Sequence, residues 1–323
     1  MTTDQSNMLG VLESFPAQCK EALALPKGIV VSEDIKNIVV CGMGGSAIGG
    51  ALLKAYMRSS KLPVFLNQDY SLPEFVDESS LVFAVSYSGN TEETLAAYHE
   101  AEKRNAKIIA ITSGGKLSQI CKTVIKIPSN LQPRAALGYL FFPMLGILYN
   151  SSLIEVKNQD LNEMLALLKD QASIKAIAEQ LARKIENKMP IIYSSELLSP
   201  AAYRFKTQIN ENAKCPAYNN VFPEMNHNEI SAFGRAMSRD RFIAILLRDA
   251  KDHPRIIKRM DVCRQIMEQR VDVLELPVKG NSLLARLFYT IAVGDFTSYY
   301  LALRERVDPT PVETIEWLKK KLG

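Results

Sequence analysis

The sequence predicts an α/β protein with two parallel sheets, each covered by helices on both faces. In the first half of the chain, short apolar runs of strand length alternate with helical segments, which is typical of parallel sheets that are buried on both sides. The same alternation resumes after a helical stretch near the middle of the chain. The length of 323 residues is more than one hydrophobic core usually fills, so we expect two domains.

Five apolar runs in the first half are the expected strands of the first sheet. They cover residues 38–41, 64–67, 81–85, 107–112 and 123–127, and residues 47–58 and 92–105 are expected helices. In parallel sheets of this kind, ligands bind beyond the carboxyl ends of the strands. Hydroxyl-bearing residues follow the expected strands at these ends, namely Ser46, Ser86, Ser88, Thr112 and Ser113.

The second half repeats the pattern after a helical stretch at about residues 153–187. Residues 189–194, 242–247 and 271–276 are its expected strands. We place the domain boundary at this helical stretch, which gives an N-terminal domain of residues 1–152 and a C-terminal domain of residues 153–323. The second half has no copy of the hydroxyl-rich turn described below, so we expect one anion site per chain.

The composition argues against several classes of protein. Apolar residues make up 47% of the chain and charged residues 23%, which is typical of a soluble globular protein. The net charge of +4 is small for this length and argues against a nucleic-acid partner. The longest apolar stretch, residues 140–149, is interrupted by Pro143 and Gly146 and is too short to span a membrane.

Cysteine usage and the N-terminal residues favour the cytoplasm. The chain has five cysteines, an odd number, and none of them forms a C-x-x-C pair. This pattern indicates neither a disulfide framework nor a zinc knuckle. The first residues lack the basic region and apolar core of a signal peptide. We therefore expect a cytoplasmic protein.

The hydroxyl-rich turn at residues 86–91 is the most informative segment of the chain. Its sequence, Ser-Tyr-Ser-Gly-Asn-Thr, lies between an apolar strand and a helix. Such a turn directs backbone N–H groups and the positive end of a helix dipole at an anion. Ser86, Ser88 and Thr91 add hydroxyl donors for phosphate oxygens. The turn therefore predicts a phosphate site that needs no metal.

A second glycine-rich turn, residues 41–50, follows the first expected strand. Its glycines allow the backbone to approach a ligand closely. Its sequence also matches a relaxed G-x-G-x-x-A dinucleotide fingerprint. That alternative requires an acidic residue at the end of the next strand, where the chain has Asn67 and only a late Asp69. It also leaves the turn at residues 86–91 unexplained, so a phosphate site is the better prediction.

Two charged residues near helix ends are candidates for chemistry. Arg134 follows a proline and is expected in the first turn of a helix. A cation there is unfavourable because it opposes the helix dipole. An anionic ligand or transition state beside Arg134 would explain this placement, and a solvated surface arginine would explain it equally well. Glu211 is expected near the end of a helix, where the dipole raises the proton affinity of a carboxylate, as a general base requires. An exposed glutamate paired with Lys214 is the simpler alternative.

Histidine occurs only at positions 99, 227 and 253, and none of the three has a partner at metal-ligand spacing, so we expect no metal site. His227 lies between two asparagines in a loop that enters a helix. The flanking amides are able to fix the tautomer of its ring. From the residues alone, a capping or structural histidine is the commoner outcome.

Together these motifs resemble the bifunctional phosphoglucose/phosphomannose isomerases, whose chains contain two sugar isomerase (SIS) subdomains. The resemblance spans nearly the whole chain. The turn at residues 86–91 alone is typical of the wider SIS superfamily, and its combination with the other motifs is more specific. Those motifs are residues 41–46 (Cys-Gly-Met-Gly-Gly-Ser), 133–138 (Pro-Arg-Ala-Ala-Leu-Gly), 210–214 (Asn-Glu-Asn-Ala-Lys) and 226–229 (Asn-His-Asn-Glu).

The resemblance implies a fold of two SIS subdomains, each a flavodoxin-like three-layer sandwich. It implies aldose–ketose isomerisation of glucose 6-phosphate and mannose 6-phosphate with fructose 6-phosphate through a cis-enediol, without metal or cofactor. Glu211 would move the proton between C1 and C2, Arg134 would stabilise the enediolate, and His227 would assist ring opening. The substrate phosphate would be held by Ser46, Ser86, Ser88 and Thr91, and Gly45 would lie beside the substrate.

The resemblance also implies a homodimer, because in related isomerases the histidine reaches the site from a neighbouring subunit. Near the C-terminus the family has a lysine at the site, for which Lys319 is the best match, although two further lysines follow it. The family also has a threonine near C2 that accommodates the mannose epimer. Thr310 and Thr314 are both candidates for this threonine.

Two other functions share the phosphate-binding turn. One is a different SIS sugar-phosphate isomerase, such as the isomerase half of a glucosamine-6-phosphate synthase. The other is a non-catalytic SIS sensor that binds a sugar phosphate and signals to a partner. A sensor is able to keep residues 86–91 and lose the groups that catalyse proton transfer. This chain retains Glu211, Arg134 and His227, which favours the enzyme.

Overall fold

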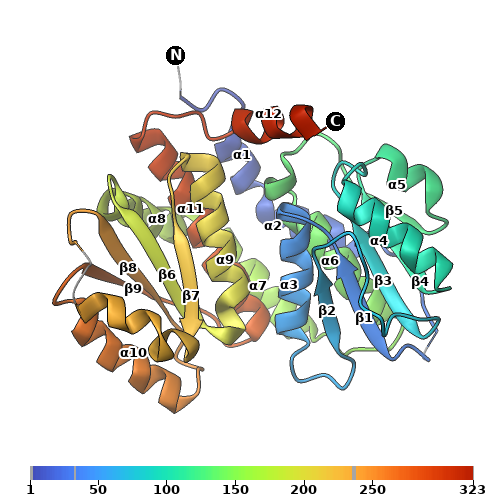
Figure 1. Cartoon of the computed structure of the whole chain (residues 1–323), viewed down its shortest axis with the longest axis horizontal. Helices are drawn as coiled ribbons and strands as arrows, with labels where there is room; N and C mark the ends of the chain where they lie inside the picture. Colours follow the sequence, from blue (N-terminus) through green and yellow to red (C-terminus); the bar gives the residue numbers. More distant parts are fainter. Residues whose placement is uncertain (1–2, 33, 235–237, 323) are drawn as a thin grey trace. The chain divides into compact units, whose positions relative to one another are not determined.

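The computed structural model of the chain describes residues 3–32, 34–234 and 238–322. Its contacts divide the chain into two compact units (Figure 1). The N-terminal unit is Ser14–Leu165, and the C-terminal unit is Met1–Glu13 with Ala166–Gly323. This division lies after the boundary expected at residues 152/153. It also assigns the first helix of the chain to the C-terminal unit, which the sequence pattern did not indicate.

Helix α1 (Met8–Glu13) belongs to the C-terminal unit because its contacts lie there. It packs on the long helix α11 (Leu283–Arg304). The carbonyl oxygen of Glu13 accepts a hydrogen bond from Nε2 of Gln171 at 2.6 Å. Gln171 is the first residue of α8 (Gln171–Ile185), which itself packs on α11.

The N-terminal unit contains a parallel sheet of five strands in the order β2-β1-β3-β4-β5. The order reverses between β1 and β3, and such a switch point is where α/β sheets bind ligands. All five expected strands are present, with ends within one residue of the prediction. They are β1 (Asn37–Cys41), β2 (Val64–Asn67), β3 (Ser80–Val85), β4 (Lys107–Thr112) and β5 (Val124–Lys126).

Alternate residues of these strands pack against two helical layers. Val39 and Val82 belong to a core cluster that includes α4 (Glu92–Lys103), and α5 (Gly115–Ile120) continues that layer. On the other face, α3 (Gly45–Tyr56) lies so close to β1 that a Cβ on Gly50 would be 2.7 Å from Cγ1 of Val40. Helix α6 (Leu137–Asn150) packs on α3, and α2 (Phe15–Ala24) packs on α6. The unit is therefore a three-layer sandwich, as expected.

The apolar stretch at residues 140–149 forms most of α6, whose residues 137–148 are all buried in the unit. Pro143 lies inside this helix, so the proline that suggested an interruption does not end it. Among the described residues, no helix combines the length and the apolar character needed to cross a membrane.

The helical stretch expected at residues 153–187 is two helices, α7 (Asn158–Lys169) and α8. The break falls at Asp170, whose carboxylate accepts a hydrogen bond from the backbone N–H of Ser173 at 3.4 Å and so caps α8. The expectation of one continuous helical region missed this capping residue because both flanking segments are amphipathic.

The C-terminal unit contains a parallel sheet of four strands in the order β7-β6-β8-β9. The three expected strands are β6 (Met189–Ser195), β8 (Phe242–Arg248) and β9 (Asp272–Pro277). The sequence pattern missed β7 (Tyr218–Phe222), which is an edge strand with an exposed Tyr218 and two asparagines. An edge strand has a neighbouring strand along only one of its two hydrogen-bonding edges, so it is less enclosed than a central strand and needs no continuous apolar run.

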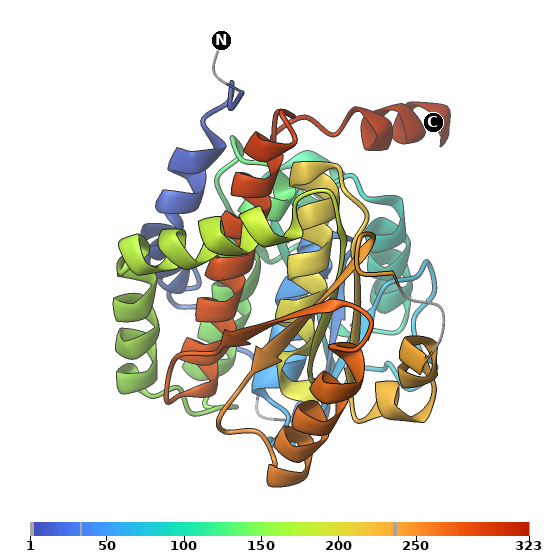
Figure 2. The same ribbon diagram turned by 90° about the vertical axis from the view of Figure 1, so that its left-hand side faces the viewer.

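Helices cover both faces of this second sheet (Figure 2). On one face, α10 (Pro254–Met267) forms a core cluster with β6 and β8 that is centred on Tyr193, Phe222 and Phe233. On the other face, α9 (Ser199–Gln208) packs on β6 and β7, and α11 packs on α8 and α9. The last helix, α12 (Glu313–Leu322), has no buried residue.

Candidate active site

The two predicted turns of the N-terminal unit lie side by side at the switch point of its sheet. Strands β1 and β3 are paired neighbours, with Cys41 opposite Ala84. The glycine-rich turn follows β1 and opens α3, and the hydroxyl-rich turn follows β3 and opens α4. The carboxyl ends of both strands and the N-termini of both helices therefore meet at one edge of the sheet. That edge contains Gly45, Ser46, Ser86, Ser88 and Thr91.

Hydrogen bonds hold three of the four predicted hydroxyls, those of Ser46, Ser86 and Thr91, in place. The hydroxyl oxygens of Ser86 and Thr91 lie 2.8 Å apart, and the backbone N–H of Gly89 donates to Oγ of Ser86 at 3.1 Å. Oγ of Ser46 accepts a hydrogen bond from the backbone N–H of Tyr87 at 3.2 Å, which links the two turns. Ser88 is exposed. The turns thus have a fixed shape, with one hydroxyl pointing outward.

Gly89 is required by this shape. Its φ is +71°, in the left-handed region that favours glycine. A Cβ at this position would lie 1.8 Å from the carbonyl oxygen of Gly114. Any other residue would therefore push the hydroxyl-rich turn away from the end of β4.

Arg134 is buried next to the glycine-rich turn. Only 3% of the residue is exposed, which excludes the solvated surface arginine considered above. A Cβ on Gly45 would lie 3.0 Å from both N and Cα of Arg134, so glycine allows this close approach. Arg134 lies in a 3-10 turn, η1 (Pro133–Ala135), just before α6, and not in the first turn of that helix as expected.

Tyr87 and Gln18 position the arginine, and neither residue was predicted from the sequence. The Tyr87 hydroxyl donates to the carbonyl of Pro128 at 2.9 Å and accepts from the N–H of Leu131 at 2.8 Å, so it fixes the loop that precedes Arg134. The Gln18 side chain bonds the carbonyl of Ala135 and the N–H of Gly138, which fixes the junction with α6. Tyr87 lies between Ser86 and Ser88 of the hydroxyl-rich turn, and this position could have marked it as part of the site. No feature of the sequence around Gln18 indicates its role.

Glu211 lies in the C-terminal unit, in a π-helical turn, Ile209–Ala213, that directly continues α9. Helix α9 begins at Ser199-Pro200 and ends just before this turn, so Glu211 lies near a helix end, as expected. π-helical turns are rare and often occur at functional sites, because the extra residue redirects the neighbouring side chains. Glu211 is half-buried.

The neighbours of Glu211 anchor this turn on three sides. The Asn212 amide donates to Oγ of Ser298 on α11 at 2.9 Å. The Asn210 amide donates to the carbonyl of Cys215 at 2.9 Å. Nζ of Lys214 donates to the carbonyls of Glu211 and Asn212 at 2.9 and 3.1 Å. The backbone that carries Glu211 is therefore held in place.

A cavity of about 580 Å³ opens beside Glu211, within the C-terminal unit. Its other wall is the segment between α11 and α12 with the first turn of α12. Thr314 belongs to this wall, whereas Thr310 and Lys319 are not among the lining residues. The lining residues are Asn210, Glu211, Lys214, Val307, Asp308, Pro311, Val312, Glu313, Thr314 and Ile315.

His227 lies at the end of a 3-10 turn, η4 (Glu224–His227), where it is exposed and outside the lining of the Glu211 cavity. The Asn226 amide N–H group donates to Sγ of Cys263 at 2.8 Å. The Asn228 amide donates to Glu224 at 2.8 Å. Both flanking amides thus make hydrogen bonds to groups other than the histidine ring that they were expected to orient.

Glu229, the last residue of the histidine motif, ties the segment around His227 to the sheet. The buried Tyr193 on β6 donates its hydroxyl to Oε1 of Glu229 at 2.5 Å. Asn220 on β7 donates to the other carboxylate oxygen. Burial and the Glu229 carboxylate together raise the pKa of Tyr193, so its hydroxyl stays protonated and remains a donor.

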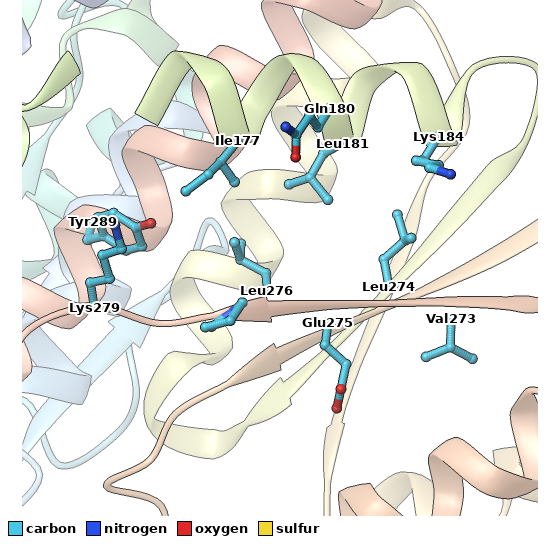
Figure 3. A pocket seen from close by; sticks show the side chains of 11 residues that line it. Ile177, Gln180, Leu181, Lys184, Val273, Leu274, Glu275, Leu276, Lys279 and Tyr289 are labelled. Atoms are coloured by element: carbon cyan, nitrogen blue, oxygen red, sulfur yellow. The ribbon is translucent and has the colours of Figure 1, made fainter. Parts of the chain in front are cut away.

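A second groove of the C-terminal unit, about 410 Å³, lies between α8 and the edge strand β9 (Figure 3). Its lining is mainly aliphatic, with Ile177, Leu181 and Leu276 among the residues. The Glu275 carboxylate is already paired with Arg248 at 3.2 Å and with Arg264 at 3.1 Å. None of the predicted site residues lines this groove, so the candidate site of this unit is the Glu211 cavity.

Comparison with known proteins identifies the family. Residues 33–141 match the SIS domain, and residues 174–322 match the bacterial phospho-glucose isomerase C-terminal SIS domain. A bifunctional phosphoglucose/phosphomannose isomerase of Caldicellulosiruptor bescii is 44% identical over 96% of this chain and 97% of its own. The chain belongs to the bifunctional phosphoglucose/phosphomannose isomerase family. The resemblance seen in the sequence motifs is thereby confirmed.

Other similarities agree with this assignment. A second bifunctional phosphoglucose/phosphomannose isomerase, from Thermoplasma acidophilum, is 44% identical over 89% of this chain and 90% of its own. Among solved structures, the C-terminal domain of glucosamine-fructose-6-phosphate aminotransferase from Francisella tularensis has a TM-score of 0.70 and covers 94% of this chain and 96% of its own, at 17% identity. At that identity the likeness shows the fold alone, and it confirms the expected SIS fold.

Proposed function

We propose that this chain interconverts fructose 6-phosphate with both glucose 6-phosphate and mannose 6-phosphate. The observation that carries the proposal is the 44% identity to a bifunctional isomerase along almost the whole of both chains. The buried Arg134 and the hydroxyl network of the N-terminal unit supply the kind of anion-binding groups that the reaction needs. The half-buried Glu211 supplies a carboxylate beside a cavity.

In this proposal the hydroxyl-rich and glycine-rich turns hold the substrate phosphate. Ser46, Ser86, Ser88 and Thr91 would donate hydrogen bonds to its oxygens, together with backbone N–H groups and the N-terminal ends of α3 and α4. Binding energy from this anchor, remote from the reacting carbons, would position C1 and C2 for reaction.

The chemistry is proton abstraction next to a carbonyl. Glu211 would act as the base that removes the proton from one carbon and returns it to the other. Negative charge develops on the enediolate oxygens, and the buried guanidinium of Arg134 would stabilise it. His227 would move the proton of the ring oxygen when the sugar opens. These groups suffice for the reaction, so we propose that it needs no metal or cofactor.

Thr314 is favoured over Thr310 as the threonine beside C2, because it lines the cavity that contains Glu211. The backbone N–H of Thr310 instead donates to the Asp308 carboxylate at 2.9 Å in the preceding turn. Lys319 lies on the exposed helix α12, and its proposed place at the site rests on the family resemblance.

A homodimer completes the proposal, with His227 serving the site of the neighbouring subunit. The exposed position of His227, outside the Glu211 cavity, supports this arrangement. We place the enzyme in the cytoplasm, where its sugar-phosphate substrates would be found. Mixing inactive Glu211→Gln and His227→Ala proteins should restore activity after verified subunit exchange. No recovery after exchange would place His227 in the site of its own chain.

A coupled assay with fructose 6-phosphate that measures the two aldose products separately tests the activity. Both products at comparable rates are expected, since both aldoses pass through the same enediol. If glucose 6-phosphate is the only product, the protein is a phosphoglucose isomerase without the mannose activity. Sugar-phosphate binding without turnover would favour the non-catalytic sensor, and a different product would favour another SIS isomerase.

A further inference from the structure

Lys214 occupies an unusual place at the end of the turn that carries Glu211. Its φ is +58° and its ψ is +23°, the left-handed conformation that ends many helices. Glycine is the usual residue there, because a side chain makes this conformation unfavourable. A lysine in this position therefore calls for an explanation beyond ending the helix.

The ammonium group of Lys214 supplies that explanation. Two of its hydrogen bonds, at 2.9 and 3.1 Å, go to the carbonyls of Glu211 and Asn212 at the end of the turn. A third, at 2.7 Å, goes to the carbonyl of Asp308, which lies 94 residues further along the chain. An ammonium has three N–H donors, and these three carbonyls match them in number.

Asp308 lies in the segment that forms the far wall of the Glu211 cavity, residues 307–315. Pro309 is buried, whereas the later part of this wall is exposed at Pro311, Glu313, Thr314 and Ile315, and α12 has no buried residue. The bond from Lys214 to Asp308 therefore connects the two walls of the cavity directly.

We propose that Lys214 is a positioning residue that fixes residues 307–315 opposite Glu211 and so determines how the substrate carbon next to the carbonyl is held. This inference rests on the proposed function and extends it. Lys214 holds the wall that includes Thr314, so it controls the rate of proton transfer and the ratio of the two aldose products. The phosphate anchor belongs to the turns of the N-terminal unit, so substrate affinity depends little on Lys214.

Lys214→Gly is the sharpest test, because it separates the two roles of this residue. Glycine suits the left-handed conformation, so a lysine that only ends the helix would be replaced without loss. For a positioning residue, kcat should fall about 10- to 100-fold, as expected for a small misplacement of reacting groups. The KM for fructose 6-phosphate should stay within about threefold, and the mannose-to-glucose product ratio should shift by more than about threefold.

Two further variants and one control complete the experiment. Lys214→Met keeps the length of the side chain and removes its donors, so it should reproduce the effect of Lys214→Gly. Lys214→Arg keeps the charge and should restore part of kcat. Lys206→Met removes a lysine on α9, whose ammonium lies over the Tyr203 ring at 5.3 Å, and should leave kcat and the product ratio unchanged.

Amide hydrogen exchange of the ligand-free protein gives a readout that does not need activity. Exchange in residues 307–315 should rise in Lys214→Gly and Lys214→Met, and should not change in Lys206→Met. Unchanged exchange there, or wild-type kcat and product ratio in Lys214→Gly, would overturn the inference. An inactive wild-type protein would instead refute the proposed function, and exchange alone would then decide whether Lys214 fixes the segment.

Discussion

Replacing Tyr87 by Phe removes one hydroxyl that fixes the loop in front of Arg134. The aromatic ring, which is 6% exposed, keeps its packing. The substitution deletes the hydrogen bonds to Pro128 and Leu131, at 2.9 and 2.8 Å, and leaves a backbone carbonyl and a backbone N–H without these partners. Each such bond contributes about 1 kcal/mol to stability, so we expect the free energy of unfolding to fall by about 2 kcal/mol.

The same change should also affect catalysis, because the loop ends three residues before Arg134. A fall of about 2 kcal/mol lowers the midpoint of thermal unfolding by about 4–8 °C for a unit of this size. If Arg134 stabilises the enediolate as proposed, kcat should fall about tenfold, since the guanidinium would lose part of its preorganisation. The KM for fructose 6-phosphate should change little, because the Tyr87 N–H that bonds Ser46 remains.

Calorimetry and steady-state kinetics measure both effects, with Tyr149→Phe as the matched control. Tyr149 lies at the end of α6, is 53% exposed and should tolerate the loss of its hydroxyl. Wild-type stability and wild-type kcat in Tyr87→Phe would show that the loop before Arg134 is held by other contacts. A fall in stability with unchanged kcat would separate the fold of this loop from the function of Arg134.

Three further changes test the site, and one tests a buried carboxyl elsewhere in the C-terminal unit. Glu211→Gln should lower kcat by several orders of magnitude while sugar-phosphate binding survives; near-normal exchange of the C2 proton with solvent would contradict its role as base. Ser86→Ala with Ser88→Ala should weaken binding of 6-phosphates and leave unphosphorylated fructose almost unaffected, and equal losses would show that the turn is only structural. Thr314→Gln should depress mannose 6-phosphate turnover more than glucose 6-phosphate turnover, and an unchanged ratio would exclude this residue. Burial raises the pKa of Asp252 above its usual 3.8, so the folded protein binds this proton more tightly than the unfolded chain does. The free energy of unfolding therefore falls as pH rises and Asp252 loses its proton. Relative to the wild type, Asp252→Asn should therefore gain stability between pH 4 and pH 7 in urea unfolding, and a constant difference would refute this.

The strands of both sheets were predictable because most of them are buried on both faces. Such strands read as continuous apolar runs, and β3 is buried at every residue. The edge strand β7 has two asparagines and an exposed tyrosine, so no apolar run reveals it. A helix after Pro133 was expected, but its continuation through residues 140–149 was not, because Pro143 and Gly146 suggest an interruption in a sequence and are accommodated in the buried helix α6.

The hydroxyl-rich turn at residues 86–91 was predictable for a different reason. Its hydroxyls, its glycine and the start of α4 are all close in sequence, so local chemistry determines its shape. The support for Arg134 is not local, since Gln18 donates to the carbonyl of Ala135 and accepts from the N–H of Gly138, and these residues lie more than a hundred positions away in the chain. The π-helical turn at Glu211 likewise depends on Ser298 and Asp308, and no local pattern in the sequence indicates it.

The exposed C-terminal wall of the Glu211 cavity has a consequence for evolution. Residues that form a core are constrained by packing, whereas α12 has no buried residue and the wall before it accepts the Lys214 hydrogen bond through a backbone carbonyl, that of Asp308. The exposed side chains of this wall, Pro311, Glu313, Thr314 and Ile315, are therefore under little packing constraint from either sheet. We expect a change of sugar preference to need only substitutions in this short segment, and exchanging the segment between relatives tests that expectation.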